Sequence, residues 1–516
     1  METNLASVDP HPRWQAGDTL TAIGLALVTV VSRLPFQIPW LHSHDAVNYA
    51  LALEHFDMRL HQPQPPGYPL YVLLGRVFYL LFHDHLAALV WLSIISSGLA
   101  VVAVYLAGRE MFGRRAGLSA ALLTATSATF WFQGEIAAPY APDLLASALV
   151  GWLCYRLLTA PRRAVVWWAA LAVGLAGALR LQTILFLFPL FLYGLRRRPW
   201  RTAAGAVILA GAVFGLFFVP AVLVSGGPAA FLLAMRTTVP IFWSTRTLIR
   251  STRWARFMRN ASIIARYTFR ALGELALPFT LLALLRFRRD SKLRFLALWV
   301  LPAWVVYFLI WPGNPGTILV CIPPFFLLAG AGLDWLLSRR RVMGWAVMLL
   351  ILTWRSVVFA ALPRYPFGHQ YRSFDNYASL VEVADQHRAK FTLLESVPPQ
   401  GTVVYANDFR LLQYYLPQYR IFSPPYLRRS APTTVRAIVS IENGISETWQ
   451  DVDVATIVPA GTERILLFDL PPEMALVAPA LLEEREKEGY AIYIMSIPEG
   501  YEPLWTLEGL TLEADE

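Results

Sequence analysis

The feature that most constrains this chain is a series of about eleven apolar segments, each able to cross a lipid bilayer if tilted and short helices are allowed. In lipid, backbone amides and carbonyls must bond to one another, so such segments fold as helices. Hydrophobic residues make up 56% of the 516 residues, more than soluble domains carry. We therefore predict a multi-pass α-helical membrane protein. The predicted spans are 18–35, 87–108, 116–133, 142–159, 164–180, 183–195, 202–223, 268–285, 295–311, 317–337 and 342–361.

Charge divides the sequence into two parts. Residues 1–361 hold 32 Lys and Arg against 13 Asp and Glu, a net charge of +19, whereas residues 362–516 hold 12 against 22, a net charge of −10. This asymmetry indicates two bodies in different environments. We predict a transmembrane domain over 1–361 and a separate domain over 362–516. The positive charge is spread through membrane loops, so nucleic-acid binding is not expected.

The loops predict the orientation, because Lys and Arg collect in short loops on the cytoplasmic side. Clusters such as Arg196–Arg198 alternate with loops poor in cations, provided that 67–82 is not a span. We therefore predict that 67–82 is a helix along the membrane surface, with Tyr68 and Arg76 at headgroup depth. The N-terminus is then cytoplasmic, 36–86 is one long external loop, and the domain after residue 361 is extracytoplasmic.

The external loop is polar and rich in ionisable side chains. Asp45 begins a predicted helix over 45–58, whose spacing places Asp45, Asn48 and Tyr49 near one face. Few other acidic residues are predicted outside, so Asp45 is the candidate for a general base. The alternative is that Asp45 only caps this helix, a position that Asp favours.

Two further features belong to this loop. His42 and His44 could bind a metal ion beside Asp45, but no full ligand set accompanies them, so no metal site is predicted and a divalent metal stays an alternative. The turn QPPGYP over 64–69 is rigid, because prolines fix φ and Gly67 allows a positive φ. It either holds a site at the water–lipid boundary or only begins the helix 67–82.

A second polar stretch follows the predicted span 116–133. Glu135 and Tyr140 lie there, close in sequence to Asp143, and ionisable residues at membrane depth often mark function. The alternative is that they cap two helices. Arg180 lies between two apolar segments with no acidic residue near it in the sequence. Such an unpaired arginine could bind a lipid-linked phosphate, or could reach ordinary headgroups.

Residues 224–267 break the charge rule, because this predicted external loop holds seven arginines and no acidic residue. One interpretation is an amphipathic helix seated on anionic headgroups. The other is a cationic rim, including Arg246, Arg250 and Arg253, for a phosphate-bearing substrate. A guanidinium group can donate two parallel hydrogen bonds to phosphate oxygens.

After residue 361 the pattern becomes that of an α/β domain. Short β-rich runs alternate with segments of helical spacing, and no Gly-rich phosphate loop, nucleophile elbow or metal-ligand cluster is present in the sequence. A binding or shielding role is therefore expected. The predicted strands are 401–408, 452–459, 463–470 and 490–497, and the predicted helices are 377–397 and 474–489.

These stretches together resemble the GT-C superfamily of polytopic glycosyltransferases, which includes protein O-mannosyltransferases and the aminoarabinose transferases that act on lipid A. The likeness covers the membrane half: a first helix, a long external loop with an early Asp and a late Pro-Pro turn, then YLAGREMFGRRAG and SATFWFQGEIAAPYA. One branch has His-Pro-Pro-Gly-Tyr-Pro in this loop. Here Gln64 replaces that histidine, and His61 is the nearest alternative.

The resemblance implies transfer of a sugar from a polyprenyl-phosphate carrier to a lipid, glycan or protein acceptor, at the outer face of a bacterial plasma membrane. It implies that Asp45 is the general base, that Glu135 and Tyr140 belong to the second external loop, and that Arg180 lies near the carrier phosphate. The predicted substrate-binding residues are Tyr49, His61, Gln64, Tyr68, Glu135, Tyr140, Arg180, Arg246, Arg250 and Arg253.

A direct displacement at Asp45 would invert the anomeric centre, because no second carboxylate is assigned as a nucleophile.

Two other functions stay open. A transporter or flippase of lipid-linked sugars would also use arginines, but it would need broken helices and a site near the bilayer midplane. The polar residues collect at one predicted surface, which favours the enzyme. A scaffold without activity is the third interpretation.

Overall fold

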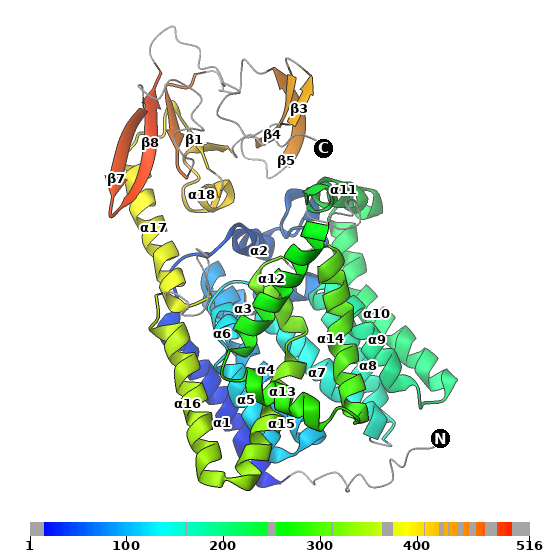
Figure 1. The fold of residues 1–516 in the computed structure, drawn as a ribbon. Helices are drawn as coiled ribbons and strands as arrows, with labels where there is room; N and C mark the ends of the chain where they lie inside the picture. Colours follow the sequence, from blue (N-terminus) through cyan, green and yellow to red (C-terminus); the bar gives the residue numbers. More distant parts are fainter. Residues whose placement is uncertain are drawn as a thin grey trace. The chain divides into compact units, whose positions relative to one another are not determined.

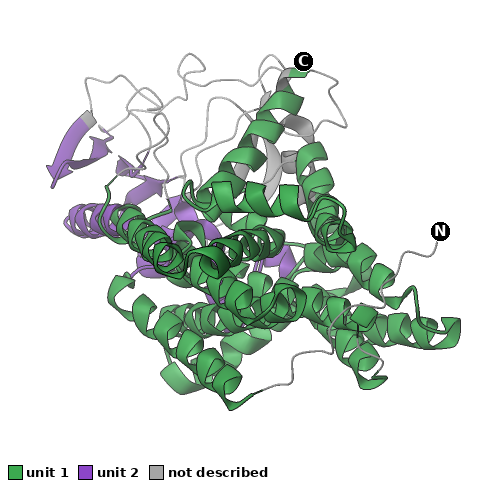
Figure 2. Cartoon of the chain, turned by 60° about the horizontal axis from the view of Figure 1, so that its bottom comes forward, with its two compact units in different colours: residues 1–38, 65–379 green, residues 39–64, 380–516 purple. Residues whose placement is uncertain are grey.

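The computed structural model forms two compact units, shown in green and purple in Figure 2. Unit 1 comprises residues 1–38 and 65–379, and unit 2 comprises residues 39–64 and 380–516. Part of the predicted external loop thus belongs to the same unit as the C-terminal domain. The structure describes residues 15–159, 162–245, 254–310, 313–363, 375–406, 408–422, 428–431, 434–440, 447–453, 461–469 and 482–497.

Unit 1 is built from helices (Figure 1). Each predicted span overlaps at least one helix, and the predicted surface segment 67–82 contains α3. The helices are α1 (Ala16–Arg33), η1 (Leu34–Phe36), α3 (Pro69–Phe82), α4 (His85–Phe112), α5 (Arg114–Ala125), α6 (Ala128–Gly134), α7 (Tyr140–Thr159), α8 (Ala164–Leu179), α9 (Leu181–Leu195), α10 (Trp200–Val224), α11 (Gly227–Thr245), α12 (Trp254–Leu272), α13 (Leu277–Arg286), α14 (Ser291–Leu309), η3 (Pro315–Val320), α15 (Pro323–Arg339) and α16 (Arg341–Ala360).

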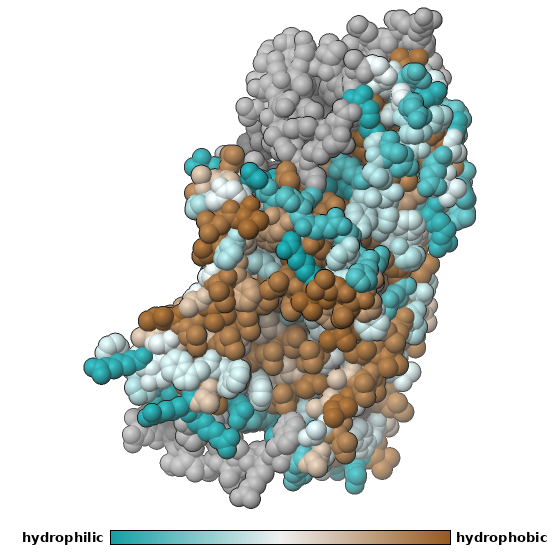
Figure 3. Space-filling view, turned by 180° about the vertical axis from the view of Figure 1, so that it is seen from behind, coloured by the Kyte–Doolittle hydropathy of each residue, from teal (hydrophilic) through white to brown (hydrophobic). Residues whose placement is uncertain are grey.

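Six helices among the described residues are long and apolar enough to cross a membrane, or seven if one bent pair counts as a span. Apolar side chains lie on their outer faces, as at Leu20 and Val28 of α1 and Ile208 of α10, and Figure 3 shows a continuous apolar area on the surface. The chain is therefore a multi-pass helical protein. The number eleven stays a prediction, because α8 and α9 are shorter than the spans counted here.

Two predicted spans are broken in the structure. Segment 116–133 divides into α5 and α6, and segment 268–285 divides into the end of α12 and α13, with a bend of 101°. The second break passes through Gly273, whose φ of +80° suits glycine. The buried Arg355 of α16 donates to the carbonyls of Leu123 and Ala271, near the ends of α5 and α12. A cation at helix C-termini stabilises both ends.

Small residues allow the helices of unit 1 to approach closely. A Cβ atom on Gly108 of α4 would lie 2.7 Å from the Cα of Gly117 on α5. Gly151 of α7 lies against the ring of Trp299 on α14, whose indole N–H donates to Ser147 at 2.8 Å. These contacts fix the helices that carry the polar residues described below.

Unit 2 contains a mixed five-stranded sheet with the order β2-β1-β6-β8-β7 and a three-stranded antiparallel sheet, β3-β4-β5. Strands β2, β1 and β6 are parallel, whereas β8 is antiparallel to both of its neighbours. The elements are α2 (His44–Glu54), η2 (Met58–Leu60), α17 (Tyr377–Glu395, which begins in unit 1), β1 (Thr402–Tyr405), α18 (Phe409–Tyr415), β2 (Arg420–Phe422), β3 (Arg428–Ala431), β4 (Thr434–Ser440), β5 (Glu447–Asp453), β6 (Arg464–Leu467), β7 (Leu482–Lys487) and β8 (Tyr490–Ser496).

The predicted helix 474–489 is wrong in its second half, where the structure has β7. The sequence Leu-Glu-Glu-Arg-Glu-Lys favours a helix by composition. Glu488 and Gly489 both have positive φ, however, and join β7 to β8 in a two-residue hairpin. Such a turn suits the twist of paired strands. The predicted strand 452–459 coincides with β5 only at 452–453, and its residues 454–459 lie outside the described part of the chain.

Candidate functional site

Asp45 lies in the first turn of α2 in unit 2, and its side chain is exposed while most of the helix is buried. Ser43 is the N-cap of α2, because its side chain accepts a hydrogen bond from the amide of Ala46. Asp45 is therefore not the N-cap, which was the alternative role for it. A carboxylate that is fixed on a helix turn and exposed at the surface can meet a substrate hydroxyl.

Tyr49 and Gln64 are brought together in the same unit. The side-chain amide of Gln64 donates to the hydroxyl of Tyr49 at 2.8 Å, and Tyr49 is 2% exposed. Gln64, at the position of the family's histidine, thus ties the end of the loop to α2. His61 lies in the left-handed region with φ of +55°, close enough to His44 for an electrostatic effect.

The histidines next to Asp45 are neutral aromatic groups in this structure. Burial lowers the pKa of His42 to about 4 and that of His44 to about 3, and the charge of Arg410 adds to the effect on His44. No group of three or more His, Cys, Asp or Glu side chains within the described ranges is placed to hold a metal ion.

The predicted turn over 64–69 has the expected backbone at Gly67, whose φ is +83°. Tyr68 is the N-cap residue of α3 and belongs to unit 1. Its phenol lies within electrostatic range of the guanidinium of Arg180. Two residues predicted to bind substrate, Tyr68 and Arg180, are therefore close to each other.

Arg180 is not an unpaired arginine, which corrects the sequence prediction. Its Nη1 donates to Oδ2 of Asp143 at 3.0 Å, and both side chains are buried. Thr183 of α9 donates to the other carboxylate oxygen. The pair joins residues 37 positions apart, and Arg180 is the residue between the end of α8 and the start of α9. Nε of Arg180 is buried without a hydrogen-bond partner among the described residues.

Tyr140 completes this cluster in unit 1. The guanidinium of Arg180 lies 5.1 Å from the centre of the Tyr140 ring, a favourable cation–π geometry. The Tyr140 hydroxyl accepts from the side-chain amide of Asn314 at 2.7 Å. Sequence reasoning missed Thr183 and Asn314; the polar break Gly313-Asn314-Pro315-Gly316 before an apolar run was the available signal.

Glu135 directly follows α6 and is 1% exposed. Neither of its carboxylate oxygens has a hydrogen-bond partner within the described residues. Arg33 supplies an electrostatic partner; its guanidinium donates to the carbonyl of Ala125 at 2.8 Å and lies 4.4 Å from the centre of the Trp131 ring. Burial raises the pKa of Glu135, while the charge of Arg33 opposes the rise. Glu135 is thus a buried carboxyl group whose electrostatic partner is Arg33.

The arginine-rich segment is described only in part. Arg246, Arg250 and Arg253 lie outside the described residues. Arg256 and Arg259 lie on α12, a strongly amphipathic helix. The two interpretations of this segment therefore stay predictions.

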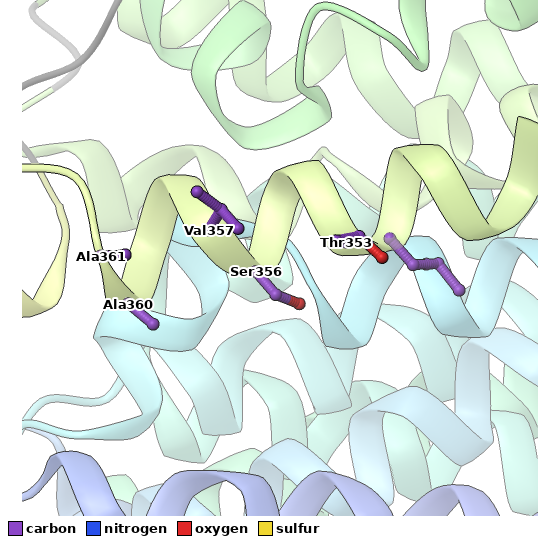
Figure 4. Close-up of a pocket in the computed structure, with 6 residues that line it drawn as sticks. Thr353, Ser356, Val357, Ala360 and Ala361 are labelled. Atoms are coloured by element: carbon purple, nitrogen blue, oxygen red, sulfur yellow. The ribbon is translucent and has the colours of Figure 1, made fainter.

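A pocket on α16 offers no charged group. It is lined by Thr353, Ser356, Val357 and their neighbours on the same helix, and the hydroxyls are its only polar side-chain groups (Figure 4). None of the predicted site residues contributes to it.

Part of the sequence and the whole fold are similar to those of known proteins. Residues 62–224 match the family described as dolichyl-phosphate-mannose-protein mannosyltransferase. No curated protein matches the sequence significantly. The structure matches that of ArnT from Cupriavidus metallidurans bound to undecaprenyl phosphate, with a TM-score of 0.54 and 14% identity, over 93% of this chain and 98% of that one. The chain has the GT-C fold.

Two further solved structures are similar to this chain. ArnT from Cupriavidus metallidurans in the apo state matches with a TM-score of 0.53 and 15% identity, again over 93% of this chain and 98% of that one. The apo oligosaccharyltransferase of Archaeoglobus fulgidus matches with a TM-score of 0.48 and 13% identity, over 78% of this chain and 64% of that one. The predicted resemblance to the GT-C superfamily is confirmed at the level of the fold.

Proposed function

We propose that this GT-C protein transfers a sugar from a polyprenyl-phosphate carrier to an acceptor hydroxyl on the extracytoplasmic face of the membrane. The observation that carries the proposal is Asp45, an exposed carboxylate on the first turn of the largely buried helix α2. The matched mannosyltransferase family and the ArnT structure with undecaprenyl phosphate support a lipid-linked phosphate as the carrier.

In the proposed step, Asp45 accepts the proton of the acceptor hydroxyl while the hydroxyl oxygen attacks the anomeric carbon. The bond from the anomeric carbon to the phosphate oxygen breaks, and its electron pair leaves with polyprenyl phosphate. A single displacement of this kind inverts the anomeric centre.

The cluster of unit 1 is assigned to the carrier phosphate. The pairing of Arg180 with Asp143 reduces the positive charge available, so Arg180 acts mainly through directed N–H groups, among them its unpartnered Nε. Tyr140 lies against this guanidinium and Tyr68 is within its electrostatic range, and both are assigned to substrate binding. Donors aimed at the departing phosphate stabilise the charge that develops there.

Broken spans such as the bent pair α12 and α13 favour a transporter of lipid-linked sugars, because broken helices are common in transporters. The two functions differ in whether the bond between sugar and phosphate is cleaved.

The test uses the full chain in lipid nanodiscs and a panel of radiolabelled polyprenyl-phosphate sugars with a hydroxyl-bearing lipid acceptor. Release of the unlabelled carrier together with a labelled acceptor supports the transferase. In liposomes, movement of the intact labelled lipid across the bilayer without cleavage would instead support the transporter, and the absence of both would contradict the proposal.

A further inference from the structure

The loop that carries Asp45 belongs to the C-terminal unit, although its neighbours in the sequence belong to unit 1. The five-stranded sheet of that unit gives a reason. Parallel strands β2 and β6 lie on opposite sides of β1. The chain runs from β1 through α18 to β2 and later returns to β6, so the strand order reverses beside β1. At such a reversal, α/β domains leave a crevice outside the carboxyl ends of their strands.

The first turn of α18, directly after the carboxyl end of β1, contacts the Asp45 loop at two points. The ring of Phe409 meets the ring of His44 edge to face, with 5.2 Å between their centres. Nη2 of Arg410 donates to the carbonyl of Leu60 at 3.1 Å. One contact is at the start of α2 and the other at the end of η2, so α18 holds both ends of this loop.

The segment before α2 is held by the same unit. The hydroxyl of Tyr415, at the end of α18, accepts from the amide of Leu41 at 2.9 Å. Trp40 packs edge to face on Tyr415 and on Phe391 of α17, with centres 4.9 and 5.0 Å apart. The loop is thus anchored on both sides of Asp45 by side chains that follow it by more than 330 positions.

Arg410 is charged, whereas the other residues that hold the loop, Phe409, Tyr415 and Phe391, are neutral. Arg410 is 1% exposed, and a buried guanidinium is costly unless its N–H groups are satisfied. The Leu60 carbonyl satisfies one of them. The guanidinium also acts electrostatically on His44, the residue before Asp45. Its position therefore ties α18 to the end of η2 and places a positive charge near His44.

We infer that α18 is the docking element of the Asp45 loop and that Arg410 is a positioning residue for Asp45. The inference rests on the proposed function for the role of Asp45. The carboxyl edge of the C-terminal sheet, where related architectures bind a small ligand, here holds a segment of the same chain. This gives the C-terminal domain a part in the reaction without a catalytic group of its own.

The test compares Arg410→Met and Arg410→Lys with a matched control, Arg388→Met. Arg388 lies on α17 in the same unit, where its exposed side chain pairs with Asp385. Hydrogen exchange of the α2 amides is measured in the full-length protein in nanodiscs, together with kcat and KM for a polyprenyl-phosphate sugar.

In Arg410→Met, loss of a charge-assisted hydrogen bond should speed exchange in α2 and lower kcat, each by about tenfold or more. KM for the donor should change by less than about twofold, because the donor is assigned to the cluster of unit 1. Arg410→Lys should recover part of both losses, and Arg388→Met should match the wild type.

Unchanged exchange in α2 of Arg410→Met would overturn the inference. If that variant fails to fold, Tyr415→Phe removes only one hydroxyl and should speed exchange at the start of α2. Unchanged exchange in Tyr415→Phe would likewise overturn the inference. The exchange measurement does not depend on catalysis. A wild-type protein without transferase activity would therefore contradict the proposed function while the docking of the loop could still be judged.

Discussion

The polar cluster of unit 1 and the Asp45 loop of unit 2 hold their ionisable groups in different ways. In unit 1, the buried Arg180 faces the buried Asp143, so charge is met by opposite charge. In unit 2, the half-buried histidines beside Asp45 have lowered pKa values and are neutral at pH 7, and the buried Arg410 donates to a backbone carbonyl. The cluster therefore depends on ionisation of its members, whereas the loop depends on packing and on its histidines staying uncharged.

The largest expected effect comes from breaking the charge pair. Arg180→Met leaves the Asp143 carboxylate buried without its cation, and this should lower the free energy of unfolding by about 3–5 kcal/mol. The measurement is reversible unfolding in mixed micelles. Arg115→Met is the matched control, because Arg115 is exposed where it pairs with the half-buried Asp334, and its loss should cost less than about 1 kcal/mol.

The double variant Arg180→Met with Asp143→Leu sharpens this result. Removing both charges should restore much of the stability lost in Arg180→Met. A double variant that is as unstable as the sum of its single variants would contradict a local pairing of the two charges.

A second prediction concerns acid. Burial lowers the pKa of His387 from an ordinary 6.5 to about 4. Burial also lowers the pKa of His42 to about 4. A base whose pKa falls on folding stabilises the folded state above its unfolded pKa, and that contribution is lost as pH falls from about 6.5 toward about 4. Unit 2 should therefore lose about 3 kcal/mol through His387 over this range.

The measurement is hydrogen exchange of α17 and α2 as a function of pH, corrected for the intrinsic exchange rate. His387→Leu should flatten the dependence. His83→Asn, at an exposed position in unit 1, should leave it unchanged. Equal loss of protection in both units would remove the contrast between them.

The smallest expected effect is at Tyr49. Tyr49→Phe removes the acceptor of the Gln64 amide and should cost about 1 kcal/mol, seen as faster exchange near residue 64. Tyr79→Phe on α3 provides the control in the other unit. An effect of several kcal/mol would mean that this hydrogen bond is a main support of the loop.

Local patterns in the sequence predicted much of the fold. Proline and glycine placed the start of α3 and the positive φ of Gly67, and β-rich runs predicted β1, β6 and β8. Residue composition alone failed at β7, because a two-residue turn and the pairing with β8 override the helical preference of its charged residues.

Long-range pairing could not be predicted in this way. Asp143 lies on α7 whereas Arg180 lies between α8 and α9, and Arg410 reaches a carbonyl 350 positions earlier in the chain. Periodicity in one segment carries no information about which distant segment it meets. Asp45, Tyr49 and Gln64 could be identified as candidates because they lie in one short stretch of sequence. The residues of α18 that contact this loop could not be identified, because they lie more than 330 positions later.

The most direct test of the account is the rate of sugar transfer by Asp45→Asn, with Glu54→Gln as the matched control. Both carboxylates are exposed and lie on α2, and both substitutions keep the size of the side chain. Asp45→Asn should lower kcat at least about a hundredfold, because an amide cannot accept the proton, while Glu54→Gln should keep wild-type activity. Full activity in Asp45→Asn would contradict the assignment of Asp45 as the general base.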